Sequence, residues 1–421
     1  MPPPPLPEIL ENAMPAVFEN NLKYYSYFYR PVSLLTAKHT ASPIMITVSP
    51  VSTRKELKEF IKFKIQLYAD NPYAVPPLYA DEIEALLEGR NPALDVYDHQ
   101  VFIARRDGRV VGRVAAIINH VSNRKTGKEF VRFGFIDFIE DFEVAKALLD
   151  TVERWGRERG MRAIHGPLGF TDFDPEGMLI HGFDELSTIA CIYNHPYYPE
   201  FLRRMGFRKD AEWVEYKISI PGEIPDKYRR IAETVRQKYG FRVLRFKKIS
   251  DIVKQGYGHK LFRLLNVTYS ELYGFSELTE EMIDYYIRKY VPLLRIELVT
   301  LIADENDELV AFGVALPSLS RAMQKARGRM FPLGAWHLLR ALKSKRAEVC
   351  DLMLIAAHPS AQNIGAAALL FTEMIPQFQK LGTIYAESNP ELIDNQRIRA
   401  LWSNFEKVLH KRRAVFAKDI G

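Results

Sequence analysis

After residue 46 the chain passes twice through a similar order of expected elements, and this repetition is the strongest constraint on its fold. The first pass has expected elements at 54–68 (helix), 101–106, 110–118 and 130–138 (strands), 143–159 (helix), 162–165 (strand), 198–205 (helix) and 213–220 (strand). The second pass has them at 298–304, 309–316 and 352–357 (strands), 366–380 (helix), 383–387 (strand) and 395–410 (helix). Alternating strands, hairpins and helices predict an α/β (α+β) fold on a mixed sheet.

The dipeptide Pro221-Gly222 separates the two passes, so we expect one domain over 46–221 and another over 222–421. A chain of 421 residues is long enough for two domains with hydrophobic cores. Residues 1–45 begin with a proline run and have no clear period, which predicts a poorly ordered N-terminal extension. A proline-rich recognition tail is the alternative, and Met45 is a candidate for the true start.

Composition narrows the class of protein. The chain is 47% hydrophobic and 26% charged, as is ordinary for a globular protein, and it has no apolar run near the ~20 residues that span a bilayer. The N-terminus lacks the basic start and apolar core of a signal peptide. Two cysteines far apart in sequence argue against a disulfide framework or a cysteine metal cluster. We therefore expect a cytoplasmic protein.

A small-residue loop follows the expected strand at 352–357 and opens the expected helix at 366–380. It consists of Gln362, Asn363, Ile364, Gly365, Ala366 and Ala367. The free N–H groups of a first helical turn and the helix dipole favour an anion, and small side chains let a pyrophosphate approach the backbone. The alternative is a small-residue helix start that merely packs on a sheet.

The pattern Gln-x-x-Gly-x-Ala after Leu-Met-Leu-Ile-Ala-Ala-His-Pro resembles the coenzyme A loop of the GNAT superfamily of N-acyltransferases. The phrase Tyr-x-x-Phe-Leu-x-x-Met-Gly-Phe, at 198–207, is similar to the closing helix and turn of GNAT domains. The resemblance implies two tandem GNAT-like domains, each a mixed, mostly antiparallel sheet flanked by helices. It also implies acetyl-CoA or another acyl-CoA as donor, or an acyl carrier protein, which presents the same pantetheine arm.

Within this resemblance the donor-binding residues are the six of the loop together with Ile355, Ala356, Ala357 and His358. A backbone N–H of the strand would also polarise the thioester carbonyl. At the matching place in the first pass stands Glu140-Asp141-Phe142-Glu143, which has no glycine and three carboxylates that would repel a pyrophosphate. We therefore expect the second domain to bind the donor and the first to lie on the acceptor side.

The segment 165–198 is crowded with glycine, proline, polar and aromatic residues. A long loop of this composition is more often a site than a connector, although a surface loop rich in turn residues is the alternative. Its run Gly-Pro-Leu-Gly-Phe-Thr-Asp-Phe-Asp, followed by Tyr-Asn-x-Pro-Tyr-Tyr, resembles a bacterial branch of tandem GNAT-like proteins that includes ceramide synthases. That resemblance implies a small-molecule or lipid amine as acceptor, such as a long-chain sphingoid amine.

Acyl transfer to an amine requires a group that removes a proton and a group that protonates the departing thiolate. Candidates for the base are Glu387, Asp174, Glu176, His181 and His358. The tyrosine that GNAT proteins commonly use as the acid is missing from 395–406, so Tyr193, Tyr197 or Tyr198 would replace it. Candidates for substrate binding are Asp172, Asn194, Tyr197 and Trp336. We expect no metal site, because His165, His181 and His195 lack metal-ligand spacing.

An insert at 318–347 holds eight Lys or Arg, no acid, and several apolar residues including Trp336. This mixture is typical of a membrane-surface segment, while a solvated helical pair packed on the sheet is the alternative. We therefore weigh a peripheral location on the inner membrane surface; nucleic acid is not the expected partner. Two other functions stay open: a catalytically silent GNAT-like protein that senses acyl-CoA or binds a partner, and a FemAB-like aminoacyl transferase.

Overall fold

The computed structural model describes residues 45–331 and 333–421. The predicted N-terminal extension, apart from Met45, lies outside the described residues. Residues 45–421 form one compact unit. Within the described ranges, no helix is both long enough and apolar enough to cross a bilayer.

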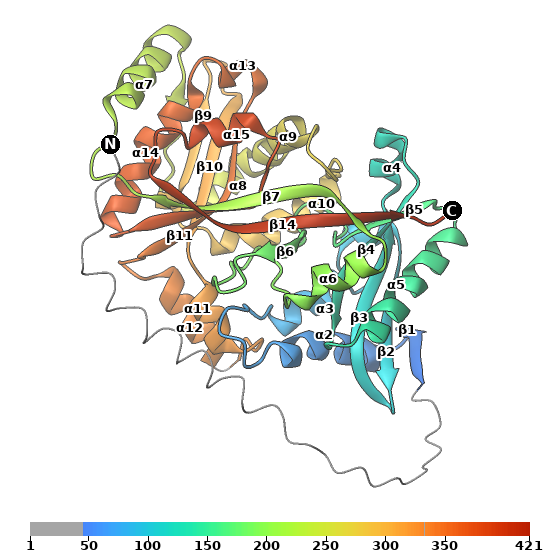
Figure 1. Cartoon of the computed structure of the whole chain (residues 1–421). Coiled ribbons are helices and arrows are strands. Elements are labelled where there is room, and N and C mark those ends of the chain that lie inside the picture. The colour runs from blue at the N-terminus through green and yellow to red at the C-terminus, as the bar shows by residue number, and fades with distance from the viewer. Residues whose placement is uncertain (1–44, 332) are drawn as a thin grey trace, which may run out of the picture. The chain divides into compact units, whose positions relative to one another are not determined.

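One large sheet runs through this unit (Figure 1). Its strands from the first pass are β1 (Ile46–Pro50), β2 (Asp98–Arg106), β3 (Arg109–Ile118), β4 (Phe130–Phe138), β5 (Ala163–Gly166), β6 (Met178–His181) and β7 (Arg208–Ser219). Those from the second are β8 (Arg242–Val243), β9 (Val299–Ala303), β10 (Leu309–Pro317), β11 (Val349–Ala357), β12 (Tyr385–Ser388), β13 (Glu391–Leu392) and β14 (Lys407–Asp419). The β4–β5 and β11–β12 pairs are parallel and the other described pairs antiparallel. This confirms the predicted mixed, mostly antiparallel sheet.

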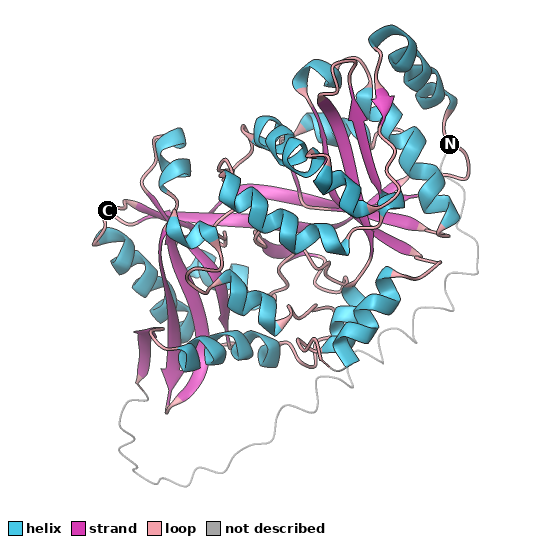
Figure 2. Cartoon of the chain, turned by 180° about the vertical axis from the view of Figure 1, so that it is seen from behind, coloured by secondary structure: helices cyan, strands magenta, loops and turns pink. Residues whose placement is uncertain are grey.

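Helices lie on both faces of the sheet (Figure 2). They are α2 (Arg54–Leu67), α3 (Tyr79–Ala85), α4 (His120–Thr126), α5 (Phe142–Arg157), α6 (Tyr197–Arg204), α7 (Asp226–Tyr239), α8 (Ile249–Lys254), α9 (Tyr257–Tyr269), α10 (Glu280–Tyr290), α11 (Ser320–Ala326), α12 (Leu333–Leu342), α13 (Pro359–Gln362), α14 (Ala366–Lys380) and α15 (Gln396–Leu401). Short 3-10 helices occur at Pro92–Asp95, Val291–Leu293 and Ile296–Leu298. The helix α14 has the bounds that the sequence predicted.

The closing strands of the two passes are exchanged. The strand order is β1-β2-β3-β4-β5-β14-β7-β12-β11-β10-β9-β8, so β14 lies between β5 and β7. As a result β7, from the first pass, is the neighbour of β12 from the second. The two long strands β7 and β14 run side by side through the middle of the sheet (Figure 1). The two halves therefore share one continuous sheet.

The prediction of a helix over 395–410 is wrong beyond Leu401. The helix α15 ends there, and β14 begins at Lys407. The next residues of β14 include Lys411 and Arg413, which are buried. They are tolerated inside because the carboxylates of Glu215 on β7 and Glu387 on β12 neutralise them, and this pairing is invisible in the local sequence.

One hydrophobic core cluster joins the two halves. It includes Phe60 and Ile103 from the first pass and Leu265 and Ile283 from the second, all nearly inaccessible to solvent. These residues come from α2, β2, α9 and α10. Because burial of apolar area is the main stabilising term in folding, the halves stabilise each other through this cluster as well as through the sheet.

Candidate active site

The sheet forks where β11 and β12 separate. These strands pair in parallel only from Val349 to Leu352, whereas β11 continues to pair with β10 as far as Ala357. In the part of the chain that the structure describes, no strand pairs with the other edge of β11 beyond Leu352. At the fork the Asn389 side-chain amide donates to the Met353 carbonyl at 2.6 Å. The free edge carries Ile355, Ala356 and Ala357 and can pair with an extended ligand through backbone groups.

The loop between β11 and α14 has unpaired backbone donors. Gly365 is the N-cap of α14 and provides no capping side chain. Among the described residues, no backbone acceptor bonds the N–H groups of Asn363, Ile364, Ala366 or Ala367. Free N–H groups at the start of a 15-residue helix favour an anion. The geometry of the loop is therefore suited to a phosphate.

Side chains around the loop fix its shape. The Gln362 amide donates to the Ala357 carbonyl at 2.8 Å, and the exposed Arg397 guanidinium donates to Gln362 Oε1 at 3.3 Å. Gly365 has φ +98°, and a Cβ atom there would lie 2.4 Å from Ile231 Cγ2 on α7. Only glycine satisfies both conditions without strain. Arg397 thus places a cation beside the Gln362 side chain at the start of the loop.

The matching helix of the first pass has no such donors. The Asp141 carboxylate caps α5 by accepting from the N–H of Glu143 at 2.9 Å and of Val144 at 3.4 Å. It also pairs with Arg106 at 2.6 Å. The start of α5 is thus already neutralised by its own side chain, in contrast to the start of α14.

A buried charge network lies at the vertex of the fork. Asp351 on β11 stands opposite Glu387 on β12 in the ladder, and both are buried. The Glu387 carboxylate is bonded to the Lys411 ammonium, which also lies 3.1 Å from Glu215. Arg413 Nε donates to Glu215 at 2.5 Å. Strand exchange creates this network, because it places β14 beside β7, which carries Glu215, and β7 beside β12, which carries Glu387.

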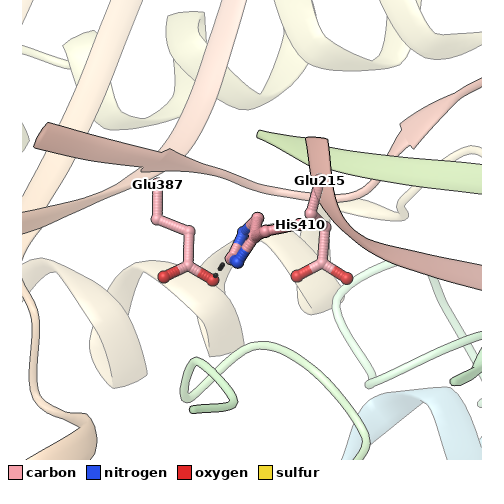
Figure 3. Close-up of side chains that lie close together, drawn as sticks. All are labelled: Glu215, Glu387 and His410. Carbon is pink, nitrogen blue, oxygen red and sulfur yellow. Dashed lines mark ion pairs between the residues drawn. The ribbon is translucent and has the colours of Figure 1, made fainter. Parts of the chain in front are cut away.

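Loop residues of the first pass cover this network. Lys411 Nζ donates to the Leu186 carbonyl at 3.1 Å, and Cys191 Sγ lies 3.7 Å from Glu215 Oε2. The His410 ring faces the Glu387 carboxylate, with Nε2 and Oε1 3.4 Å apart (Figure 3). The predicted base Glu387 therefore sits where residues of both passes meet.

Burial and neighbouring charges shift the pKa values of these groups in different directions. Burial and the Glu387 charge raise the pKa of Asp351 to about 7, and both its carboxylate oxygens lack a hydrogen bond within the described residues. Burial also raises the pKa of Glu387, against the opposing effect of Lys411. The Arg413 and Lys411 cations outweigh burial and lower the pKa of Glu215 to about 2. Burial and the Lys411 charge lower the pKa of His410 to about 4, so its ring is neutral at pH 7.

The residues Glu215, Glu387 and His410 offer ligand atoms within 4.8 Å of one another, as a metal ion would require (Figure 3). The Lys411 ammonium already lies between the two carboxylates. A metal would have to displace this ammonium and would meet the Arg413 guanidinium as well, so the donor set fits a metal poorly. The expectation of no metal site stays a prediction.

A second pair of carboxylates, Asp172 and Glu176, is within electrostatic reach of Arg132 of β4. The buried Arg132 guanidinium donates to the carbonyl of Gly169 at 3.1 Å and of Gly274 at 2.8 Å. Burial raises the pKa of Asp172 to about 7, and burial and the Asp172 charge raise that of Glu176 well above its usual range. Neither carboxylate has a cation within 4.0 Å among residues 45–331 and 333–421. This pair is therefore short of positive charge.

Asp174 has a different role from its two neighbours. Its carboxylate accepts from the N–H of Phe170 at 2.9 Å and of Thr171 at 3.1 Å, which closes the turn of the loop. The Thr171 hydroxyl in turn lies 2.5 Å from that of Tyr286 on α10. Residues 170–174 are thus held against the second half of the chain.

Tyr269 of α9 links the Arg132 group to the free edge of β11. Its hydroxyl donates to the Ile355 carbonyl at 3.3 Å. Burial raises its pKa to about 12, and the charges of Asp172 and Glu391 add to the effect. Tyr269 is therefore a protonated donor placed at the strand predicted to hold the thioester.

The other predicted site residues are scattered. Tyr198 is fully buried and exchanges hydrogen bonds with the Phe138 backbone at 2.8 and 3.2 Å. Tyr197 donates to the Phe138 carbonyl at 2.8 Å, and Tyr193 to that of Phe183 at 2.9 Å. The Asn194 side chain pairs with the Leu179 backbone at 2.7 and 3.1 Å. The polar groups of these four side chains are thus hydrogen-bonded to backbone groups of the first half.

Three predicted residues lie at the surface or at a helix end. His181 is exposed at the end of β6, and Trp336 is exposed on α12. His358 Nδ1 lies 2.7 Å from the Ser360 hydroxyl and caps α13. The roles assigned to these residues from sequence stay predictions.

Three neighbours of the predicted site were missed. Asp351 precedes the apolar run from which the strand was predicted. The alternation of side chains along β11, continued back to Val349, is the signal that could have identified Asp351. Tyr269 and Arg132 are distant in sequence from the loop and the fork. An arginine in a mostly apolar strand, Phe130–Phe138, is itself a sequence signal.

Comparison with known proteins agrees with this geometry. No protein-family model matches the chain. The chain is 27% identical over 328 residues to Protein YghO of Escherichia coli (strain K12), covering 76% of this chain and 82% of that protein. It is 28% identical over 319 residues to a bacterial ceramide synthase of Caulobacter vibrioides (strain NA1000 / CB15N), covering 75% and 82%.

Among solved structures, the tandem GNAT protein from the clavulanic acid biosynthesis pathway matches with a TM-score of 0.50 at 11% identity. The match covers 90% of this chain and 99% of that one. The chain therefore has the tandem GNAT fold, and the resemblance seen in the sequence is confirmed at the level of the fold.

Proposed function

We propose that the chain is an acyltransferase that moves an acyl group from a pantetheine thioester to an amine. The observation that carries the proposal is the fork of β11 and β12 next to the uncapped start of α14. The free edge suits an extended amide-containing arm, and the N–H groups of the loop suit its pyrophosphate. The similarity to a ceramide synthase and the tandem GNAT fold support the same activity.

The donor would be acyl-CoA. The cationic Arg397 and the four free N–H groups of the loop supply what a pyrophosphate needs. An acyl carrier protein presents the same pantetheine arm without the adenosine diphosphate part. Affinity for free coenzyme A that depends on the loop would therefore favour the nucleotide donor.

The acceptor would bind as an ammonium ion beside Asp172 and Glu176. Each carboxylate is partly buried and has no cation within 4.0 Å among the described residues. Burial raises the pKa of Asp172 to about 7 and that of Glu176 well above its usual range. The ammonium gives one proton to a carboxylate, and the resulting amine attacks the thioester carbon. The C–N bond forms and the C–S bond breaks. The second proton of the nitrogen passes to the other carboxylate of the pair, and the thiolate takes a proton from the Tyr269 hydroxyl. Solvent later restores the Tyr269 proton and removes the protons from the carboxylates.

Asp351 and Glu387, at the vertex of the fork, would also take up protons in this reaction. A carboxyl group that titrates at about 7 is matched to taking up a proton at physiological pH. The similarity to a ceramide synthase favours a long-chain amine, such as a sphingoid base, over a small one.

Calorimetric titration of palmitoyl-CoA and acetyl-CoA tests the donor site. Gly365 is unsuitable for this test because any side chain there meets Ile231. Asn363 is exposed, so Asn363→Glu adds a charge beside the phosphate site, and Asn363→Gln is its uncharged control. We expect Asn363→Glu to weaken binding about 10-fold, as one unfavourable charge contact of roughly 1.4 kcal/mol requires, and Asn363→Gln to leave it unchanged. Failure of the wild type to bind either thioester would refute the donor site.

An acylation assay with sphinganine and a panel of small amines tests the acceptor. We expect turnover of the long-chain amine with release of free thiol. Turnover of small amines alone would refute the lipid acceptor but leave the acyltransferase in place. Tight acyl-CoA binding without turnover of any amine would favour a silent acyl-CoA-binding protein. Two observations favour this second candidate function. Asp351 is completely buried, and Glu387 is already paired with Lys411.

A further inference from the structure

We call one segment of the second half the basic hairpin. It consists of α11, α12, the residues that connect them and residues 343–346, and it has an exposed apolar face. The exposed fractions of Phe331, Leu333, Trp336 and Leu339 are 80%, 66%, 53% and 51%. Eleven large apolar side chains are exposed among the described residues, and four of them lie within these nine positions. Such clustering marks an interaction surface rather than ordinary surface scatter.

The same hairpin presents cations that have no counter-charge. Its basic residues are Arg321, Lys325, Arg327, Arg329, Arg340, Lys343, Lys345 and Arg346, and all of them are exposed. Residues 318–347 include no acid. None of the eight has a carboxylate within 4.0 Å in the described ranges. Isolated cations on one surface attract an anionic partner.

The opposite side of the hairpin is fixed to the first half of the chain. Leu338 and Met323 are buried in a cluster with Leu78. The Gln324 amide donates to the carbonyls of Pro72 and Ala74 at 2.8 and 3.0 Å. The inner side of the hairpin is therefore fully packed against the first half, as the alternative of a helical pair that merely packs on the protein predicts. The apolar residues of the outer side are left without a partner within the described chain.

We propose that the basic hairpin docks onto an anionic lipid bilayer. The apolar side chains would enter the boundary between headgroups and acyl chains, and the cations would lie at the headgroup phosphates. Trp336 suits this boundary, and the Arg340 guanidinium lies 5.3 Å from its ring centroid. An acidic protein would match the cations but not the four protruding apolar groups. The proposal does not depend on the reaction.

Sedimentation of the full chain with vesicles tests the proposal. Vesicles of phosphatidylcholine alone are compared with an equal mixture of phosphatidylcholine and phosphatidylglycerol. We expect binding to the mixed vesicles and much weaker binding to the neutral ones. The triple variant R340Q/K343Q/K345Q should lower the partition coefficient for mixed vesicles about 100-fold, since each cation near an anionic surface contributes about 1 kcal/mol. The single variant Trp336→Ser should also weaken binding to the mixed vesicles.

The chain offers a matched control for net charge. Lys55, Lys58 and Lys62 of α2 are exposed and have no ion pair among the described residues, so K55Q/K58Q/K62Q removes the same charge elsewhere. This variant should bind like the wild type. Equal weakening by both triple variants would show that binding depends on net charge alone and would overturn the proposal.

Tryptophan fluorescence locates the contact. The chain has four tryptophans, and Trp155, Trp213 and Trp402 are buried whereas Trp336 is exposed. A blue shift on adding mixed vesicles, lost in Trp336→Phe, would place the contact at the hairpin. A blue shift that follows protein concentration without lipid would instead indicate a second copy of the chain. A shift with an acidic carrier protein but not with vesicles would indicate a protein partner, and either result overturns the proposal.

Discussion

Replacement of Asp351 by asparagine should stabilise the fold at neutral pH, although it changes a buried polar side chain. Burial and the Glu387 charge raise the pKa of Asp351 to about 7, whereas an aspartate in an unfolded chain titrates near 4. Between these values the native state holds a proton that the unfolded state releases. The free energy of unfolding therefore falls as pH rises from about 4 to 7 and is flat above.

The size of the effect follows from the same two values. A difference of about three pKa units, at 1.36 kcal/mol each, gives a penalty of about 4 kcal/mol above pH 7. Asparagine has nearly the same shape and does not titrate, so it avoids the penalty. We expect the urea midpoint of Asp351→Asn to exceed that of the wild type at about pH 8 and to equal it near pH 4.

Glu215→Gln is a control of opposite sign on the same sheet. The Arg413 and Lys411 cations lower the pKa of Glu215 to about 2, so its stabilisation is present above about pH 4 and is lost as pH falls through 2. Glu215→Gln should cost about 3–5 kcal/mol at neutral pH, because it leaves two buried cations short of a partner. A lower urea midpoint for Asp351→Asn at pH 8 would refute the reasoning, since it would mean that the Asp351 charge is paired in the native state.

Three further substitutions test the site. Gly365→Ala should lower the free energy of unfolding by roughly 2–5 kcal/mol, because a left-handed φ and the contact with Ile231 both oppose a Cβ atom; an unchanged urea midpoint would contradict the loop geometry. Tyr269→Phe should lower kcat about 100-fold with little change in the KM of the donor, and a change in KM alone would exclude Tyr269 as the acid. Asp172→Asn should raise the KM of the amine about 10- to 100-fold while leaving calorimetric donor affinity unchanged; an unchanged KM would place the ammonium elsewhere.

The sequence predicted those parts of the fold that depend on local signals. The helix α14 has the predicted bounds because small residues open it and Leu381-Gly382 close it. The loop before it was recognised from six consecutive residues. Pairing between distant strands leaves no such local signal, which is why residues 407–410, the start of β14, were predicted as helix and Asp351 was overlooked.

The buried charges of β14 show the same limit of local signals. Lys411 and Arg413 are compatible with a buried strand only because carboxylates on β7 and β12 neutralise them. Glu215 and Glu387 supply these carboxylates, but they lie 198 residues before Arg413 and 24 residues before Lys411. A rule based on local composition could not have connected these four residues.

Strand exchange gives a physical reason for two GNAT-like halves in one chain. The second half provides the fork and the loop proposed to bind the phosphates, while β7 of the first half pairs with β12 and carries Glu215. The first half provides Asp172 and Glu176; the charge of Asp172 acts on Tyr269 of the second half, whose hydroxyl donates to the Ile355 carbonyl of β11. Separation of the halves would expose the edges of β7 and β14 and leave Lys411 and Arg413 without Glu215. Donor groups, acceptor groups and the charges that stabilise the sheet are thus distributed so that neither half can form the proposed site alone.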